Sequence, residues 1–123
     1  MITGYNTMVY NFTYIVVFGF ICFDVITGIL RAIYKGIVNS VCLRKGLIHK
    51  FTEILTLAGC GLINYSADYY GIEKFPDLVT AFAIYICTME LISIIENLSE
   101  VNPVLSGFFK PYLEKLKKGE QEK

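Results

Sequence analysis

The sequence predicts an all-α membrane protein with three transmembrane helices. Of its 123 residues, 54% are hydrophobic and only 18% are charged, and the mean hydropathy is +0.53. The apolar residues are concentrated in three runs, each about long enough for a helix that crosses ~30 Å of hydrocarbon. Most lysines and arginines lie outside these runs. A soluble helical bundle is the alternative, but it would expose much of this apolar surface to water.

The first run, residues 12–33, reads FTYIVVFGFICFDVITGILRAI and is predicted to be the first transmembrane helix. No lysine or arginine precedes it and no A-x-A cleavage site closes it, so we expect it to stay attached rather than to be removed as a signal peptide. Gly28 and Ala32 form a small-xxx-small pair that favours close helix contact. One face of the helix carries four residues at helical spacing, namely Asp24, Thr27, Gly28 and Arg31.

A basic segment, residues 34–50, is predicted to be a cytoplasmic loop. Between Asp24 and Glu53 there is no acidic residue, whereas five cations lie there: Arg31, Lys35, Arg44, Lys45 and Lys50. Lysine and arginine are retained on the cytoplasmic side of a bilayer. Residues 41–48 are expected to form an interfacial turn. Four residues are expected to interrupt any long helix in this segment: Gly36, Asn39, Ser40 and Gly46.

The second run, residues 51–70, is the least apolar and is predicted to be the second transmembrane helix. Polar or small residues recur along it every four positions and therefore share one helix face: Thr52, Thr56, Cys60, Asn64 and Asp68. We expect this seam, together with Glu53 and Glu90, to line the lumen of an oligomer or to contact other copies.

The third run, residues 78–95, is predicted to be the last transmembrane helix, after a short external turn at 71–77. A small and polar stripe follows it at helical spacing: Thr80, Ala83, Cys87, Glu90 and Asn97. Residues 96–123 hold five lysines and five glutamates and are predicted to be a mobile, charged cytoplasmic tail. Pro103 and Pro111 are expected to interrupt this tail, with a short amphipathic helix at 110–118.

The distribution of lysine and arginine predicts the orientation of the chain. The segment before the first run has none, the basic loop together with Arg31 at the end of the first run has five, the second connection has one and the tail has five. Three spans satisfy this count when the N-terminus lies outside and the C-terminus lies in the cytoplasm. The whole chain, residues 1–123, is therefore predicted to be one integral-membrane domain.

Asp24 and Glu90 are the unexpected residues, because a carboxylate inside a transmembrane helix costs ~2.5–3.5 kcal/mol on insertion scales. Such groups normally face protein or water rather than lipid. Asp24 is expected to pair with Arg31 or another cation and fix the packing, or a carboxyl group stays protonated in the membrane. In the functional alternative, these groups line a water-filled path or join subunits.

Several function classes have no support in the sequence. It shows no nucleophile–base pair and no phosphate-binding glycine loop. The four cysteines form no CxxC pair and have no zinc-type spacing, and the single histidine gives no metal cluster. The formal net charge is zero. We therefore expect no enzymatic activity, no metal site, no cofactor and no nucleic-acid partner.

A set of residues across the first run and the basic loop resembles the motif of the toxin-secretion/phage-lysis holin family: Asp24, Thr27, Gly28, Ala32, Ser40, Lys45, Gly46 and Lys50. The resemblance covers about a quarter of the chain. It implies a small phage or prophage protein that accumulates in the host bacterial cytoplasmic membrane. There it would oligomerise into lesions that release an endolysin or a toxin, without binding that cargo directly. The family gives these residues no catalytic role.

Other functions fit the same sequence. An antiholin, a non-lytic regulator of the same family, has nearly the same sequence requirements, and an antiholin is also an expected partner of a holin. A small oligomeric ion channel or transporter subunit is a second alternative, and a structural subunit of a membrane assembly is a third.

Overall fold

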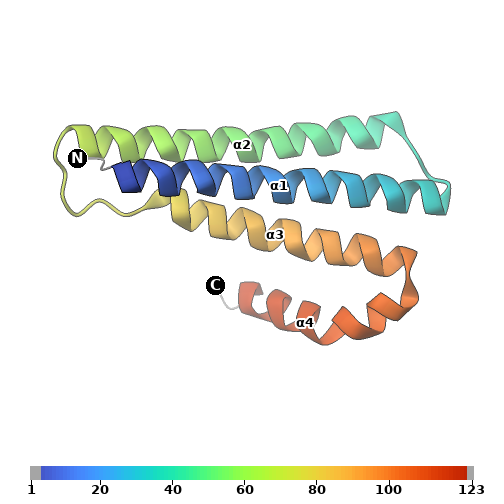
Figure 1. The fold of residues 1–123 in the computed structure, drawn as a ribbon. Coiled ribbons are helices and arrows are strands. Elements are labelled where there is room, and N and C mark those ends of the chain that lie inside the picture. The colour runs from blue at the N-terminus through green and yellow to red at the C-terminus, as the bar shows by residue number, and fades with distance from the viewer. Residues whose placement is uncertain (1–3, 122–123) are drawn as a thin grey trace. The chain divides into compact units, whose positions relative to one another are not determined.

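The structure, a computed structural model, describes residues 4–121, with side chains for residues 11–119. Figure 1 shows the element order along the chain. Within the described residues there is no strand, and the helices are α1 (Gly4–Lys35), α2 (Ser40–Tyr69), α3 (Leu78–Val101) and α4 (Pro103–Gln121). The predicted all-α fold class is confirmed.

Three of these helices are long and apolar enough to cross a membrane, as predicted. The candidate spans are residues 11–35, 40–69 and 78–101. Each is longer than its predicted apolar run because the helical hydrogen bonding continues into the more polar flanking residues. The third helix, for example, continues six residues past the predicted end at residue 95 and ends at Val101.

The connection between α1 and α2 is much shorter than the predicted loop. Gly36 ends α1 in the left-handed conformation, with φ 68°, and Ile37 N–H donates to Ala32 O at 2.9 Å, which is the Schellman arrangement. Helix α2 then begins at Ser40, so the expected interruption at Gly46 and the interfacial turn at 41–48 are wrong. A glycine inside a helix costs only ~1 kcal/mol relative to alanine, which does not break a helix of this length.

The second connection uses the same kind of helix end. Gly71 has φ 72°, and Ile72 N–H donates to Ala67 O at 2.9 Å. Asp77 then caps α3, because its carboxylate accepts hydrogen bonds from the Thr80 backbone N–H at 3.1 Å and the Thr80 hydroxyl at 2.6 Å. The short turn predicted at 71–77 therefore lies between a capped C-terminus of α2 and a capped N-terminus of α3.

The chain divides into two compact units, and α1 and α3 each contribute to both. The first unit combines the part of α1 up to Gly19 with residues 40–86, and its most buried side chains are Val17, Val79 and Ile86. The second unit combines residues 20–39 with residues 87–123. Its buried apolar side chains are Ile21, Ile92, Ile94 and Ile95.

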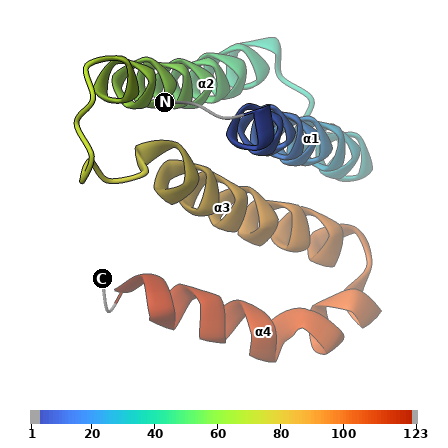
Figure 2. The ribbon, with the colours of Figure 1, turned by 60° about the vertical axis from the view of Figure 1, so that its left-hand side comes forward.

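In the second unit, α4 follows α3 after Asn102 and turns back along it, as both views show (Figures 1 and 2). Pro103 occupies the first helical position, where its missing N–H costs nothing. Pro111, expected to interrupt the tail, instead lies inside α4. The helix continues through it because apolar side chains on both sides of Pro111 are half-buried along one stripe, namely Leu105, Phe109, Leu113 and Leu116. Mobility of the tail stays a prediction.

Candidate functional site

A set of four polar side chains on α1 and α3, the buried polar cluster, is buried within the second unit. The relative exposure is 6% for Asp24, 3% for Thr27, 2% for Glu90 and 6% for Asn97. Polar groups are rarely buried this deeply unless they are hydrogen-bonded, and the cost is highest in a membrane helix. This cluster is therefore the strongest candidate for a functional site.

Asn97 links the two helices through its side-chain amide. Its Nδ2 atom donates to Asp24 Oδ1 at 3.1 Å and to Thr27 Oγ1 at 3.1 Å. The Thr27 hydroxyl in turn donates to the backbone oxygen of Asp24 at 3.0 Å. The Thr27 hydroxyl thus accepts a hydrogen bond from Asn97 on α3 and donates one to the backbone of α1, so it acts as both donor and acceptor.

The spacing of these residues along α1 and α3 shows which face of each helix is buried. Thr27 follows Asp24 by three residues, so both lie on one face of α1. Asn97 follows Glu90 by seven residues, which is two turns of α3 and the same face. The stripe predicted on the third run is therefore the face that α3 buries at these two positions.

A layer of ion pairs lies one turn further along both helices. Arg31 Nη1 and Lys35 Nζ each lie 3.1 Å from Glu100 Oε2. All three side chains are about 40% exposed, and pairs of this kind contribute ~0–1 kcal/mol in water. Arg31 therefore pairs with a glutamate on α3, whereas one expectation from the sequence was a pair with Asp24.

Gly28 borders the cluster without making the close contact that the small-xxx-small pattern predicts. A Cβ atom at Gly28 would lie 3.6 Å from Asn97 Nδ2, an ordinary van der Waals distance. Ala32 is half-buried. The packing of α1 against α3 at this point therefore has room for a methyl group.

Gly28→Ala is accordingly expected to be tolerated. Alanine is favoured over glycine in a helix by ~0.5–1 kcal/mol, so the free energy of unfolding in detergent should stay unchanged or rise slightly. Thermal unfolding followed by circular dichroism measures this, with Gly28→Leu as the matched variant that overfills the same space. A clear loss of stability in Gly28→Ala would contradict the observed spacing.

The remaining motif residues lie at the start of α2, in the first unit. Ser40 is the first residue of α2, and Lys45 and Gly46 are exposed within its first turns. Lys50 is half-buried one turn later. The motif thus supplies two members of the buried cluster, Asp24 and Thr27, and does not form a single site.

The seam predicted on the second run is not uniform. Thr52 and Thr56 are exposed, and their hydroxyls donate to backbone oxygens of their own helix at 2.6 and 2.8 Å. Cys60 is buried, and Asn64 and Asp68 are half-buried. The seam is therefore exposed at its start, at Thr52 and Thr56, and packed within the chain from Cys60 onward.

Asn64 bridges α2 to the start of α3. Its Oδ1 accepts from Val79 N–H at 3.0 Å and its Nδ2 donates to the Pro76 oxygen at 2.8 Å. The first N–H groups of a helix have no partner within the helix, so Asn64 acts as a cap supplied by another element. Both polar atoms of the Asn64 amide are therefore hydrogen-bonded to backbone groups of this chain.

Glu53, also predicted as a site residue, has a largely buried side chain, and its Oε1 atom lies 3.1 Å from His49 Nδ1 on the preceding turn of α2. It belongs to the first unit, whereas Asp24 and Glu90 belong to the second. Among the described residues, no group of three or more His, Cys, Asp or Glu side chains is placed to hold a metal ion.

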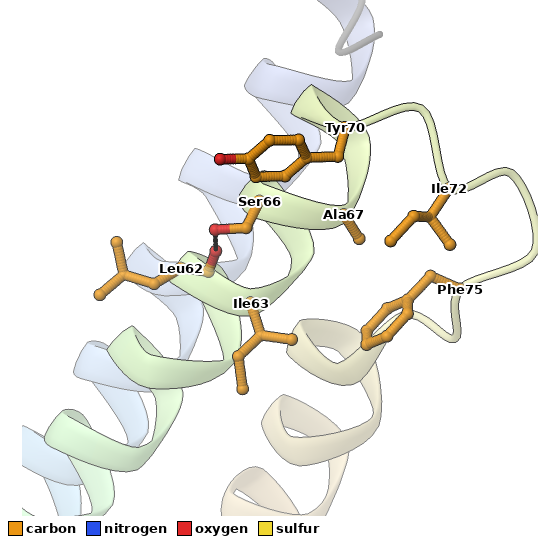
Figure 3. A pocket seen from close by; sticks show the side chains of 7 residues that line it. All are labelled: Leu62, Ile63, Ser66, Ala67, Tyr70, Ile72 and Phe75. Atoms are coloured by element: carbon orange, nitrogen blue, oxygen red, sulfur yellow. Dashed lines mark hydrogen bonds between the residues drawn. The ribbon is translucent and has the colours of Figure 1, made fainter.

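An open groove lies at the far end of α2, within the first unit (Figure 3). Its lining is apolar apart from two hydroxyl groups, and the residues are Leu62, Ile63, Ser66, Ala67, Tyr70, Ile72 and Phe75. The Ser66 hydroxyl is already bonded to the Leu62 oxygen at 2.8 Å. None of these seven side chains is charged.

Asn97 and Glu100 are the site residues that the sequence did not single out as functional. In the sequence, Asn97 belongs to the polar stripe of the third run and Glu100 belongs to the charged tail. The available signal is their spacing, because Glu90, Asn97 and Glu100 lie at helical intervals of seven and three. That spacing shows a shared face but not the partner across it.

Comparison with known proteins adds the family. No curated protein and no solved structure matches this chain. A family model described as the bacteriophage holin family matches residues 2–118. That range covers nearly the whole chain, including all three candidate spans and both halves of the buried polar cluster, and the chain belongs to the bacteriophage holin family.

Proposed function

We propose that this protein is a lytic holin. It accumulates in the host bacterial cytoplasmic membrane, assembles with copies of itself and opens lesions that release an endolysin or an exported toxin, which causes timed lysis. The observation that carries the proposal is the family match over residues 2–118 on a chain with three helices able to cross a membrane. The proposal gives no residue a catalytic role and involves no cofactor, metal or nucleic acid.

The proposed orientation has the N-terminus outside and the C-terminus in the cytoplasm. Lys35 lies at the end of α1, and Arg44 and Lys45 lie in the first turns of α2, so the helix ends on both sides of the connection are strongly basic. The α2–α3 connection carries Lys74 next to Glu73 and Asp77. This asymmetry supports a cytoplasmic first connection and an external second one.

The proposed assembly uses the exposed part of the α2 seam. Thr52 and Thr56 lie on the surface with their hydroxyls bonded to their own helix, so they can face either another copy or water. Cys60 is buried within the chain, and the Asn64 side chain is hydrogen-bonded to the start of α3. Single cysteines scanned along α2, in a chain with its native cysteines replaced, should show a four-residue period of accessibility in the lytic state.

The decisive experiment is inducible expression in a bacterium with and without a cytoplasmic muralytic enzyme. A holin should arrest growth when expressed alone and should lyse the culture only when the enzyme is also present. The matched control is the enzyme expressed without this protein, because the enzyme cannot reach the cell wall across an intact membrane.

Other outcomes would identify the alternatives. Intact membrane potential, together with delayed lysis when a separate holin is supplied, would identify an antiholin. Selective ion conductance without release of a protein-sized marker would identify a channel or transporter subunit. Normal growth with none of these effects would leave a structural subunit as the better description.

A further inference from the structure

Helix α4 has two apolar stripes, and only one of them packs within the chain. The half-buried stripe consists of Leu105, Phe109, Leu113 and Leu116. The other stripe is exposed, at 79% for Val104, 64% for Phe108 and 57% for Tyr112. These three residues are spaced four apart and therefore form a continuous surface, on which the rings of Phe108 and Tyr112 lie 6.2 Å apart.

Two lysines extend this exposed surface. Lys115 follows Phe108 by seven residues and therefore shares its side of α4. Lys118 follows Lys115 by three and lies at the edge of the same surface, and both lysines are exposed. Lys117 lies on another side of the helix and pairs with Glu96 of α3. The surface thus combines one aliphatic residue, two aromatic rings and two cations. Amphipathic helices that lie in the membrane interface have this composition.

The connection to α3 places this surface at the boundary of a candidate span. α4 begins two residues after the last residue of α3, and Lys117 contacts Glu96, the first residue after the apolar run 78–95. Lysines are strongly disfavoured within hydrocarbon, so the contact of Lys117 with Glu96 places the lysine-rich end of α4 at the level of the lipid headgroups. At that level, its exposed rings face the acyl boundary and its lysines face phosphate groups.

We propose that this exposed surface of α4, formed by Val104, Phe108, Tyr112, Lys115 and Lys118, binds the surface of an anionic phospholipid bilayer. The apolar members enter the interface, and the two lysines bind the phosphate groups. The half-buried stripe, which is offset from the exposed one by a single residue, stays packed within the chain, so α4 can contact the lipid without losing that packing. The tail is then a membrane-surface helix rather than a solvated extension.

The chain contains no tryptophan, which allows a clean test. Full-length Phe108→Trp and, separately, Tyr112→Trp are reconstituted into vesicles of phosphatidylcholine with phosphatidylglycerol. Lipids brominated near the headgroup end of the acyl chain should quench both tryptophans. The matched control is Glu114→Trp, which lies outside the exposed stripe and should be quenched much less.

The lysines are tested in the same vesicles. Lys115→Gln with Lys118→Gln should lower the ratio of surface-bound to free α4 by about 5-fold per lysine, and added salt should have the same effect. Vesicles of phosphatidylcholine alone should reproduce the loss. Lys110→Gln, on another side of α4, is the control for a general charge effect and should change little.

Three results would overturn the proposal. Equal quenching of Phe108→Trp and Glu114→Trp would show that the stripe does not face lipid. Equal quenching in neutral and anionic vesicles would remove the lysines from the binding surface. Quenching that falls as the protein-to-lipid ratio rises would show that a second copy covers the stripe instead.

Discussion

Replacing Asn97 by leucine is expected to lower the free energy of unfolding by about 1–3 kcal/mol. The substitution removes the amide that bridges Asp24 on α1 and Thr27 on the next turn, both at 3.1 Å. Hydrogen bonds between transmembrane helices contribute ~0.6 kcal/mol on average and at most ~1.7. The larger part of the effect therefore comes from the buried carboxyl group, which loses a donor that water cannot replace. Unfolding in mixed micelles, followed by circular dichroism, measures the change.

A double-mutant cycle isolates this interaction from a general loss of packing. Asn97→Leu should cost less in the Asp24→Leu background, because replacing both polar partners avoids leaving one of them buried without the other. Asp24→Asn, which keeps an oxygen acceptor at the same position, is the conservative control and should have a smaller effect. Strictly additive costs for Asp24→Leu and Asn97→Leu would mean that the two side chains do not interact.

Asn64→Ala is expected to lower the free energy of unfolding by about 1–2 kcal/mol, because the start of α3 loses a cap. Both amide atoms of Asn64 are used, one for Val79 N–H at 3.0 Å and the other for the Pro76 oxygen at 2.8 Å. Neither backbone group has an intrahelical partner at this end of α3. The same unfolding experiment in mixed micelles measures the loss. Asn64→Asp keeps only the acceptor, so its free energy of unfolding should lie between those of the wild type and Asn64→Ala.

Ser66→Ala, two residues further along α2, is the matched control. Its hydroxyl is bonded only within its own helix, to the Leu62 oxygen, and the residue is exposed, so the change should stay within about 0.5 kcal/mol. The pair of variants also tests the predicted lumen seam. If Asn64→Ala leaves stability unchanged but alters lysis or conductance, the amide faces a lumen and the capping role is wrong.

The fold was largely predictable from the sequence because its main signal is one of length and polarity. Three apolar runs give three long helices, and glycines with positive φ end α1 and α2. The extent of α2 was not predictable, because the cost of Gly46 is small and the flanking residues support a helix. The path through Pro111 was also missed, since it depends on the half-buried stripe of α4 rather than on local propensity.

The candidate site was only half predictable. The free-energy cost of the Asp24 carboxylate in a membrane helix, and the helix face that Asp24 shares with Thr27, identified the residues that α1 contributes to the cluster. The other side required knowing which turn of α3 meets them, and helical spacing gives a face without a register between helices. The residues predicted to form one seam on the second run also differ in burial and in their hydrogen-bond partners, which helical spacing does not specify. Hydroxyl groups of threonine can bond to their own helix, whereas the Asn64 amide reached the start of α3.

The most direct test of the central claim, that three helices cross the membrane with the α1–α2 connection in the cytoplasm, uses a native thiol. Cys42 is exposed in the first turn of α2, at the very start of the candidate span 40–69, whereas the other three cysteines lie further inside the candidate spans and are half-buried or buried. A membrane-impermeant maleimide, applied before any loss of membrane potential, should label Cys42 only after the cells are permeabilised. Glu73→Cys, in a Cys42→Ser background, should be labelled in intact cells. Labelling of Cys42 in intact cells with an intact membrane potential would contradict the account.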